Sequence, residues 1–145
     1  MSPHFPSTRK TVTPRQARAL GGGAILLVVA LEVAGRIACG GRDFGSLGIA
    51  LAFLLIPLSP ALVALLTPNP LCAVAAAAPV AGWIAYAIYF DCVRPYQGGG
   101  ASLVYVGVWF YGFMSATVAA IAAIPLLRLS GVRVSGTEPL QGPPK

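Results

Sequence analysis

Residues 46–90 read SLGIALAFLLIPLSPALVALLTPNPLCAVAAAAPVAGWIAYAIYF, and no side chain in this stretch is charged. It contains two apolar runs, 46–66 and 71–90, separated by Thr67-Pro68-Asn69-Pro70. A helix needs about 20 mostly apolar residues to cross the hydrocarbon layer of a membrane, and both runs reach that length. Two prolines so close together end one helix and start a turn. We therefore expect two transmembrane helices joined by a tight hairpin, with no room for a binding site in the turn.

The same apolar composition continues on both sides of this stretch. Residues 19–39 and 101–127 are further apolar runs, and between residues 44 and 127 only Asp91 and Arg94 are charged. The chain of 145 residues is 57% hydrophobic and 10% charged, whereas ordinary soluble domains carry about 25% charged residues. The sequence therefore predicts an all-α integral membrane protein. It is expected to be a four-helix bundle with short loops and transmembrane helices at 19–39, 46–66, 71–90 and 101–127.

Basic residues gather in the two tails, 1–18 and 128–145. They are Arg9, Lys10, Arg15, Arg18, Arg128, Arg133 and Lys145. An even number of crossings puts both tails on one side, and the positive-inside rule places that side in the cytoplasm. Both tails are rich in Pro, Ser, Thr and Gly, so we expect them to be flexible segments on either side of a 19–127 domain. The short loops and the Ala-, Gly- and Pro-rich composition favour a bacterial inner membrane.

The first apolar run has a second interpretation, as the core of a cleaved signal peptide behind a basic N-terminus. Arg36-Ile37-Ala38-Cys39 even resembles a lipoprotein cleavage site. However, Arg36 stands where such sites have an aliphatic residue, and Glu32 interrupts the apolar core. Both residues favour a helix that is retained in the mature protein.

Glu32 and Arg36 form the clearest polar pair of the membrane region. They lie four residues apart and so share a face of the first helix. Charges inside a membrane-spanning segment are costly and suggest a functional site. One interpretation is an intramembrane site for a proton, a cation or a partner subunit. The other is an ion pair near the interface that lowers its own insertion cost. No further ionisable group lies deep in the other three runs, which favours the ion pair.

The cysteines suggest a covalent link on the outer side of the membrane. Cys39 ends the first predicted helix and Cys92 follows the third, so both are expected on that side. In an oxidising compartment they could form a disulfide, provided that their Cα atoms approach to within about 7 Å. The alternative is a pair of free thiols near the interface. Cys72 lies on the opposite side and is expected to be a reduced packing residue.

The longest outer connection, 91–100, is the expected place for recognition, with Asp91, Arg94, Tyr96 and Gln97 as its candidate residues. Aromatic residues gather nearby in the third and fourth helices and are typical of an interfacial belt. They are Trp83, Tyr86, Tyr89, Phe90, Tyr105, Trp109 and Phe113.

Small residues recur at the spacing typical of helix packing in lipid. The predicted packing faces are Ala30, Ala34 and Ala38; Ala78 with Gly82 and Ala81 with Ala85; and Gly112, Ala116 and Ala120.

No motif in the chain indicates a reaction. It has no recognisable nucleophile–base pair, paired carboxylates, metal-ligand cluster or cofactor motif, so we predict no catalytic, metal or cofactor site and no enzyme activity. The positive charge is explained by topology, which leaves no reason to expect nucleic-acid binding. The leading hypothesis is a small membrane protein that binds another membrane protein, as an accessory subunit or an inhibitor or immunity-type partner. The alternative is a transporter or pore that uses Glu32 and Arg36 and forms by homo-oligomerisation. The expected partners are therefore the lipid bilayer and either another membrane protein or further copies of this chain.

Overall fold

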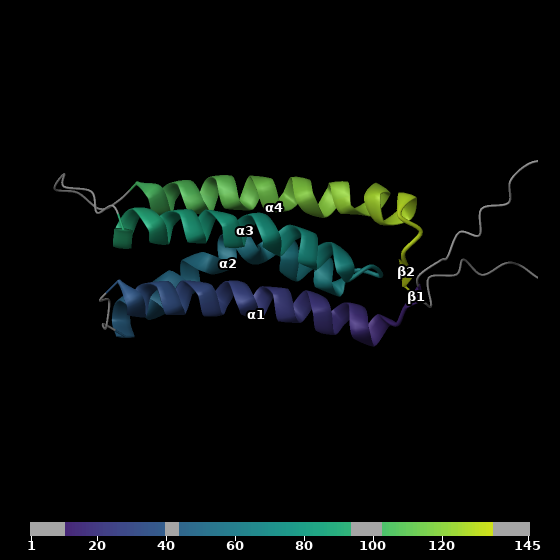
Figure 1. The fold of residues 1–145 in the computed structure, drawn as a ribbon, viewed down its shortest axis with the longest axis horizontal. Helices are drawn as coiled ribbons and strands as arrows, with labels where there is room; N and C mark the ends of the chain where they lie inside the picture. Colours follow the sequence, from purple (N-terminus) through teal and green to yellow (C-terminus); the bar gives the residue numbers. More distant parts are fainter. Residues whose placement is uncertain (1–10, 40–43, 94–102, 135–145) are drawn as a thin grey trace, which may run out of the picture.

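The computed structural model describes residues 11–39, 44–93 and 103–134. Four long helices run side by side along the longest axis of the molecule (Figure 1). The elements in chain order are β1 (Thr11–Val12), α1 (Pro14–Ala38), α2 (Phe44–Leu66), α3 (Leu71–Ile88), the π-helix η1 (Tyr89–Val93), α4 (Val104–Leu129) and β2 (Arg133–Val134). The predicted bundle of four helices is confirmed.

Each of the four helices is long and apolar enough to cross a membrane. Their outward faces are also apolar: Leu26 and Leu27 on α1 are each 69% exposed, and Val63 on α2 and Ile121 on α4 are each 63% exposed. Soluble monomeric proteins rarely expose so large an apolar surface to water. Together the spans and the apolar exterior indicate a membrane protein.

α1 begins before the apolar run that starts at residue 19, because a capping box starts the helix at Pro14. The Gln16 amide donates to Thr13 Oγ1 at 3.3 Å, and the Thr13 amide donates to Gln16 Oε1 at 3.2 Å. Pro14 fits the first helical position, where its missing N–H is not needed. Residues 11–18, which the sequence places in a flexible tail, are therefore ordered into β1 and the first turn of α1.

The later helices also differ from the predicted spans at their ends. α3 gives way after Ile88 to η1, which continues to Val93, and α4 runs from Val104 to Leu129 in place of 101–127. A π-helix bonds residue i to residue i+5, so it widens the last turn and changes the direction of the side chains that follow. Asp91 and Cys92 both lie within this π-helical turn.

α3 lies in the middle of the bundle and packs against α1, α2 and α4. Its buried face is made mostly of small residues, with Ala73, Ala76, Val80 and Ala87 all at 0% exposure. Small side chains let helix backbones approach closely, which is the main source of packing energy in lipid. On α4 the predicted face is supported at Gly112 and Ala116, which are buried.

Most of the small residues selected on the first and third helices lie outside the contacts between the four helices. Ala30, Ala34 and Ala38 are exposed on α1, as are Ala78, Gly82 and Ala85 on α3. The face of α1 that enters the bundle instead carries Gly21, Ile25, Val28, Glu32 and Gly35. An Ala-rich helix repeats small residues on several faces, so spacing alone does not select one. At Gly21, by contrast, an added Cβ would lie 2.9 Å from the Pro70 carbonyl oxygen, so only glycine fits there.

The two ends of the described chain meet in a short parallel pairing, in which Thr11 aligns with Arg133 and Val12 with Val134. α4 ends in a reversal at Gly131, whose φ of +71° is in the left-handed region, and the Val132 amide donates to the Leu127 carbonyl at 3.2 Å. This 6→1 hydrogen bond is typical of a helix that ends at a glycine. We call this end of the bundle, with β1 and β2, the terminal end (Figure 1).

Candidate functional site

The end of the bundle opposite the terminal end contains the polar side chains of α1. Arg36 Nε donates to Glu32 Oε1 at 2.7 Å. Glu32 is 4% exposed and is the one buried charged residue in the described part of the chain. The pair lies four residues apart on α1, as the sequence predicts, and Glu32 faces the bundle while Arg36 lies nearer the helix end.

Tyr105 on α4 connects this ion pair to Asp91 in η1. The guanidinium carbon of Arg36 lies 5.2 Å from the centroid of the Tyr105 ring, a cation–π distance. The Asp91 carboxylate lies close enough to the Tyr105 hydroxyl to interact with it. We call Glu32, Arg36, Tyr105 and Asp91 the polar cluster. It joins α1, η1 and α4 through side chains at this end of the bundle.

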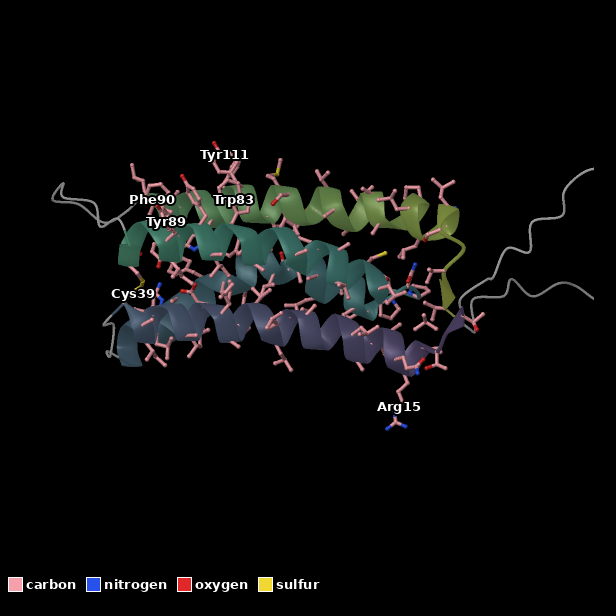
Figure 2. The ribbon with its side chains drawn as sticks, viewed as in Figure 1. Arg15, Cys39, Trp83, Tyr89, Phe90 and Tyr111 are labelled. Atoms are coloured by element: carbon pink, nitrogen blue, oxygen red, sulfur yellow. A yellow bond between two sulfur atoms is a disulfide. The ribbon has the colours of Figure 1, made fainter. Side chains whose placement is uncertain are left out.

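A disulfide stands beside the polar cluster. Cys39, just after α1, and Cys92, in η1, are bonded, with their Cα atoms 5.1 Å apart. This agrees with the predicted pairing and fixes the end of α1 to the end of α3. We call this the disulfide end of the bundle; Figure 2 labels Cys39 there, with a cluster of aromatic side chains nearby.

The chemistry of the polar cluster is that of a paired network in which Glu32 is buried and the other members are partly buried. It holds two carboxylates, one guanidinium and one phenol, and each of these groups contacts another member. Such a network is stabilising when all its members have partners. Within residues 11–39, 44–93 and 103–134, no group of three or more His, Cys, Asp and Glu side chains could hold a metal ion.

Of the predicted recognition residues, only Asp91 can be placed. Its side chain is half-buried and interacts with Tyr105. Arg94, Tyr96 and Gln97 lie outside the described residues.

An aromatic surface covers the outward side of α3, η1 and α4 near the disulfide end. We call it the aromatic patch; it consists of Trp83, Tyr86, Tyr89, Phe90, Phe110 and Tyr111. The rings of Trp83 and Tyr111 stack with centroids 5.5 Å apart, which joins the two helices. Figure 2 shows Trp83, Tyr89, Phe90 and Tyr111 gathered on one side of the bundle.

The predicted aromatic belt is thus divided by the structure into different environments. Tyr105 belongs to the polar cluster, and Trp109 stacks on Phe53 of α2 with centroids 4.3 Å apart. Phe110 and Tyr111, which the four-residue spacing did not select, complete the patch instead. Their exposure of 63% and 56% could not be read from an α4 sequence that is apolar on all sides.

The expectation that the turn after α2 has no room for a site was also wrong. Thr67, Pro68 and Asn69 line a cavity of about 910 Å³ at the terminal end.

Comparisons with protein-family models, with curated protein sequences and with solved structures found no significant match for this chain.

Proposed function

We propose that this chain is a non-catalytic membrane protein that binds another membrane protein, as an accessory subunit or as an inhibitor or immunity-type partner. The aromatic patch is the observation that carries the proposal. Tyr86, Phe110 and Tyr111 are 49%, 63% and 56% exposed, although large aromatic side chains dominate the energetics of protein interfaces. Their rings contact one another in pairs, so the surface is already ordered before a partner arrives.

The depth of the tyrosines supports a protein partner over a lipid belt. Tyr111 follows Val104, the first residue of α4, by about 10 Å of helical rise, and Tyr86 precedes Val93 by a similar length. Neither hydroxyl has a hydrogen-bond partner among the described residues. A hydroxyl held in an apolar environment without a partner is costly. A polar group on a neighbouring transmembrane helix would satisfy it.

The disulfide end provides a rigid base for this contact. The Cys39–Cys92 bond and the polar cluster fix α1, η1 and α4 against one another, next to the patch. Preorganised surfaces lose less conformational entropy when they bind. Binding by the outer connection through Arg94, Tyr96 and Gln97 belongs to the same proposal, because that connection follows η1 directly.

The proposed topology places both termini in the cytoplasm of a bacterial cell and the disulfide on the oxidising outer side of its inner membrane. The pairing of β1 with β2 supports an arrangement in which the two basic tails share one side. Thiol labelling of single-cysteine variants at residues 5 and 97 in intact cells tests this placement. Labelling at residue 5 by a membrane-impermeant reagent would contradict it.

Site-specific photo-crosslinking tests the proposed binding. A photoreactive phenylalanine analogue replaces Tyr111 or Phe110, and the matched control replaces Leu27, which is 69% exposed on α1. We expect a discrete crosslinked species from the patch positions and none from residue 27. A protein that stays an uncrosslinked monomer in its native membrane, or that crosslinks equally from both faces, is incompatible with the proposal.

The alternative, an oligomeric transporter or pore, is favoured by one observation. The polar cluster combines two carboxylates with a single guanidinium, which suits a cation near the disulfide end. Four helices rarely enclose a path, so several copies would be needed. Ion flux into liposomes, compared between the wild type and Glu32→Gln, separates the two functions. Absence of flux in both proteins rejects the transporter.

A further inference from the structure

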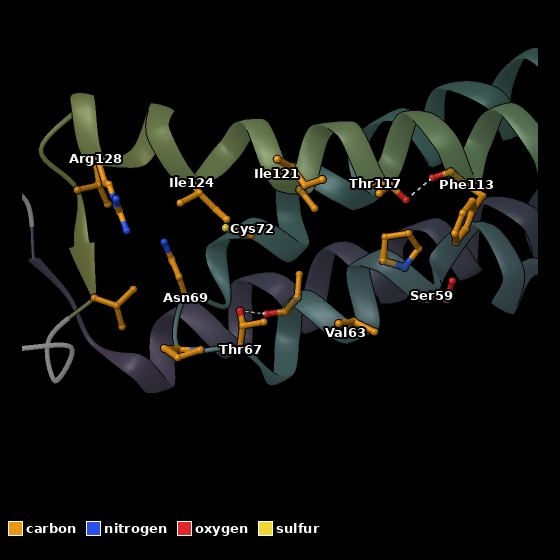
Figure 3. Close-up of a pocket in the computed structure, with 16 residues that line it drawn as sticks. Ser59, Val63, Thr67, Asn69, Cys72, Phe113, Thr117, Ile121, Ile124 and Arg128 are labelled. Carbon is orange, nitrogen blue, oxygen red and sulfur yellow. Dashed lines mark hydrogen bonds between the residues drawn. The ribbon is translucent and has the colours of Figure 1, made fainter.

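The cavity at the terminal end is an elongated slot between α2 and α4, with the start of α3 behind it (Figure 3). Along α4 its lining extends from Phe113 to Arg128, which is about 22 Å of helical rise. Half of a bilayer's hydrocarbon layer is about 15 Å thick. The slot is therefore long enough for one acyl chain of a single leaflet together with part of its headgroup.

The walls of the slot are apolar and open to the surroundings of the bundle. Val63 on α2 and Ile121 on α4 are each 63% exposed, and Ile124 is 44% exposed. The hydroxyls along the slot are already bonded to backbone carbonyls: Ser59 to Ile56 at 2.7 Å, Thr67 to Ala64 at 2.6 Å and Thr117 to Phe113 at 2.8 Å. The walls therefore present mainly hydrocarbon to whatever enters from the lipid.

Polar groups without partners gather at one end of the slot only. Asn69 Oδ1 is buried and has no hydrogen-bond partner among the described residues. Arg128 makes no ion pair with any described residue. Figure 3 shows the nitrogen atoms of Asn69 and Arg128 pointing toward the same space, beyond Ile124 and Cys72. Two groups of N–H donors facing one space favour an anion, and the buried amide oxygen adds a need for a hydrogen-bond donor.

We propose that the slot binds an anionic glycerophospholipid from the leaflet at the terminal end. Its phosphate accepts hydrogen bonds from Arg128 and from the Asn69 amide nitrogen, and a headgroup hydroxyl donates to Asn69 Oδ1. One acyl chain lies between α2 and α4 against Val63, Ile121 and Phe113. Phosphatidylglycerol has the phosphate, the headgroup hydroxyl and the acyl chain that these contacts require. Phosphatidylcholine is zwitterionic and has no hydrogen-bond donor in its headgroup.

Lipid retention by the full-length protein tests this assignment. The protein is purified in a mild detergent, titrated with dioleoyl phosphatidylglycerol or dioleoyl phosphatidylcholine, and examined by native mass spectrometry. We expect phosphatidylglycerol to bind about tenfold more tightly, which corresponds to about 1.4 kcal/mol. Equal affinity of the wild type for the two lipids overturns the proposal.

Variants separate the headgroup site from general surface charge. Arg128→Gln should remove the preference for phosphatidylglycerol, and Asn69→Ala should reduce it. The matched control is Arg15→Gln, which removes the same charge at the same end of the bundle; Arg15 is on α1 and points away from the bundle in Figure 2. If Arg15→Gln and Arg128→Gln reduce the preference equally, the attraction is unspecific and the site is rejected.

Three further measurements test the position of the acyl chain and the other possible occupants of the slot. Ile121→Trp places a larger side chain at an exposed wall position and should lower retention of both lipids several-fold; an unchanged retention contradicts the chain's position in the slot. Glycerol 3-phosphate in excess should not displace the lipid, and displacement would assign the site to a free phosphate. Deletion of residues 136–145 should leave retention unchanged, and a several-fold increase would assign the slot to the chain's own C-terminal residues.

Discussion

The two ends of the bundle differ in whether their polar side chains have partners. At the disulfide end Glu32, Arg36, Tyr105 and Asp91 contact one another, and a covalent bond holds the helices together. At the terminal end Asn69 Oδ1 lacks a partner and Arg128 makes no ion pair with a described residue. In an apolar environment a paired network stabilises the fold, while an unpaired group is costly unless something else binds it. Polar side chains are therefore paired with one another at one end and left without partners at the other, where we propose that a lipid binds.

Loss of the disulfide should have the largest effect on this contrast. Cys39 and Cys92 are separated by 53 residues, and closing a loop of that length is worth about 4 kcal/mol, a value that the bilayer reduces because it already confines the unfolded helices. We expect reductant to lower the midpoint of unfolding in mixed detergent micelles. Cys72→Ala should leave that reductant effect intact. An unfolding midpoint that does not respond to reductant would show that the disulfide does not contribute to the stability of the protein.

Glu32→Ala should have the second largest effect and lower the free energy of unfolding by about 3 kcal/mol. It leaves Arg36 without its carboxylate partner next to the Tyr105 ring, and breaking one side of a buried pair costs more than removing both. Glu32→Gln keeps an oxygen acceptor for Arg36 Nε and should cost distinctly less. Equilibrium unfolding of the two variants in the same micelles measures the difference. Equal losses would mean that the volume of the side chain matters here and its hydrogen bond does not.

Two glycines of α1 should respond to the same substitution with opposite signs. At Gly21 a Cβ would lie 2.9 Å from the Pro70 carbonyl oxygen and 3.1 Å from Ala73 Cβ, whereas at Gly23 it would meet nothing within 4 Å. Gly21→Ala should therefore destabilise the protein by about 1–3 kcal/mol. Gly23→Ala should stabilise it by about 0.5–1 kcal/mol, because alanine loses less backbone freedom in a helix. Thermal unfolding of both variants decides the matter, and shifts of equal sign would contradict the tight contact at Gly21.

The smallest expected effect is at the start of α1. Thr13→Ala removes the side-chain acceptor of the Gln16 amide and should cost about 1 kcal/mol. Thr13→Ser keeps the oxygen and serves as the control. Amide hydrogen exchange at Gln16 and Ala17 is the appropriate measurement because the loss is local. Unchanged exchange in Thr13→Ala would indicate that the pairing of β1 with β2 alone holds the first turn.

The number and type of the helices could be predicted because residues 46–90 contain no charge, and a chain without charges in that range has few alternatives to lipid. Counting crossings placed Cys39 and Cys92 on one side and so made their pairing possible, but it left two free thiols as the alternative. The role of Tyr105 could not be predicted, because its interactions with Arg36 on α1 and Asp91 in η1 join elements far apart in the sequence. The slot was missed for a similar reason: it needs Asn69, Arg128 and Val134 together, and the reversal at Gly131 that returns the chain across this end is a tertiary feature.

The pairing of β1 with β2 also has a consequence for the order of events during synthesis. Thr11 and Val12 are synthesised before the four helices, but their partners Arg133 and Val134 are synthesised only after α4. Cys39 and Cys92 are both present once η1 has been made, so their bond needs no residue of α4. The terminal end, by contrast, can close only after translation has passed α4, so it is the last part of the described fold to form.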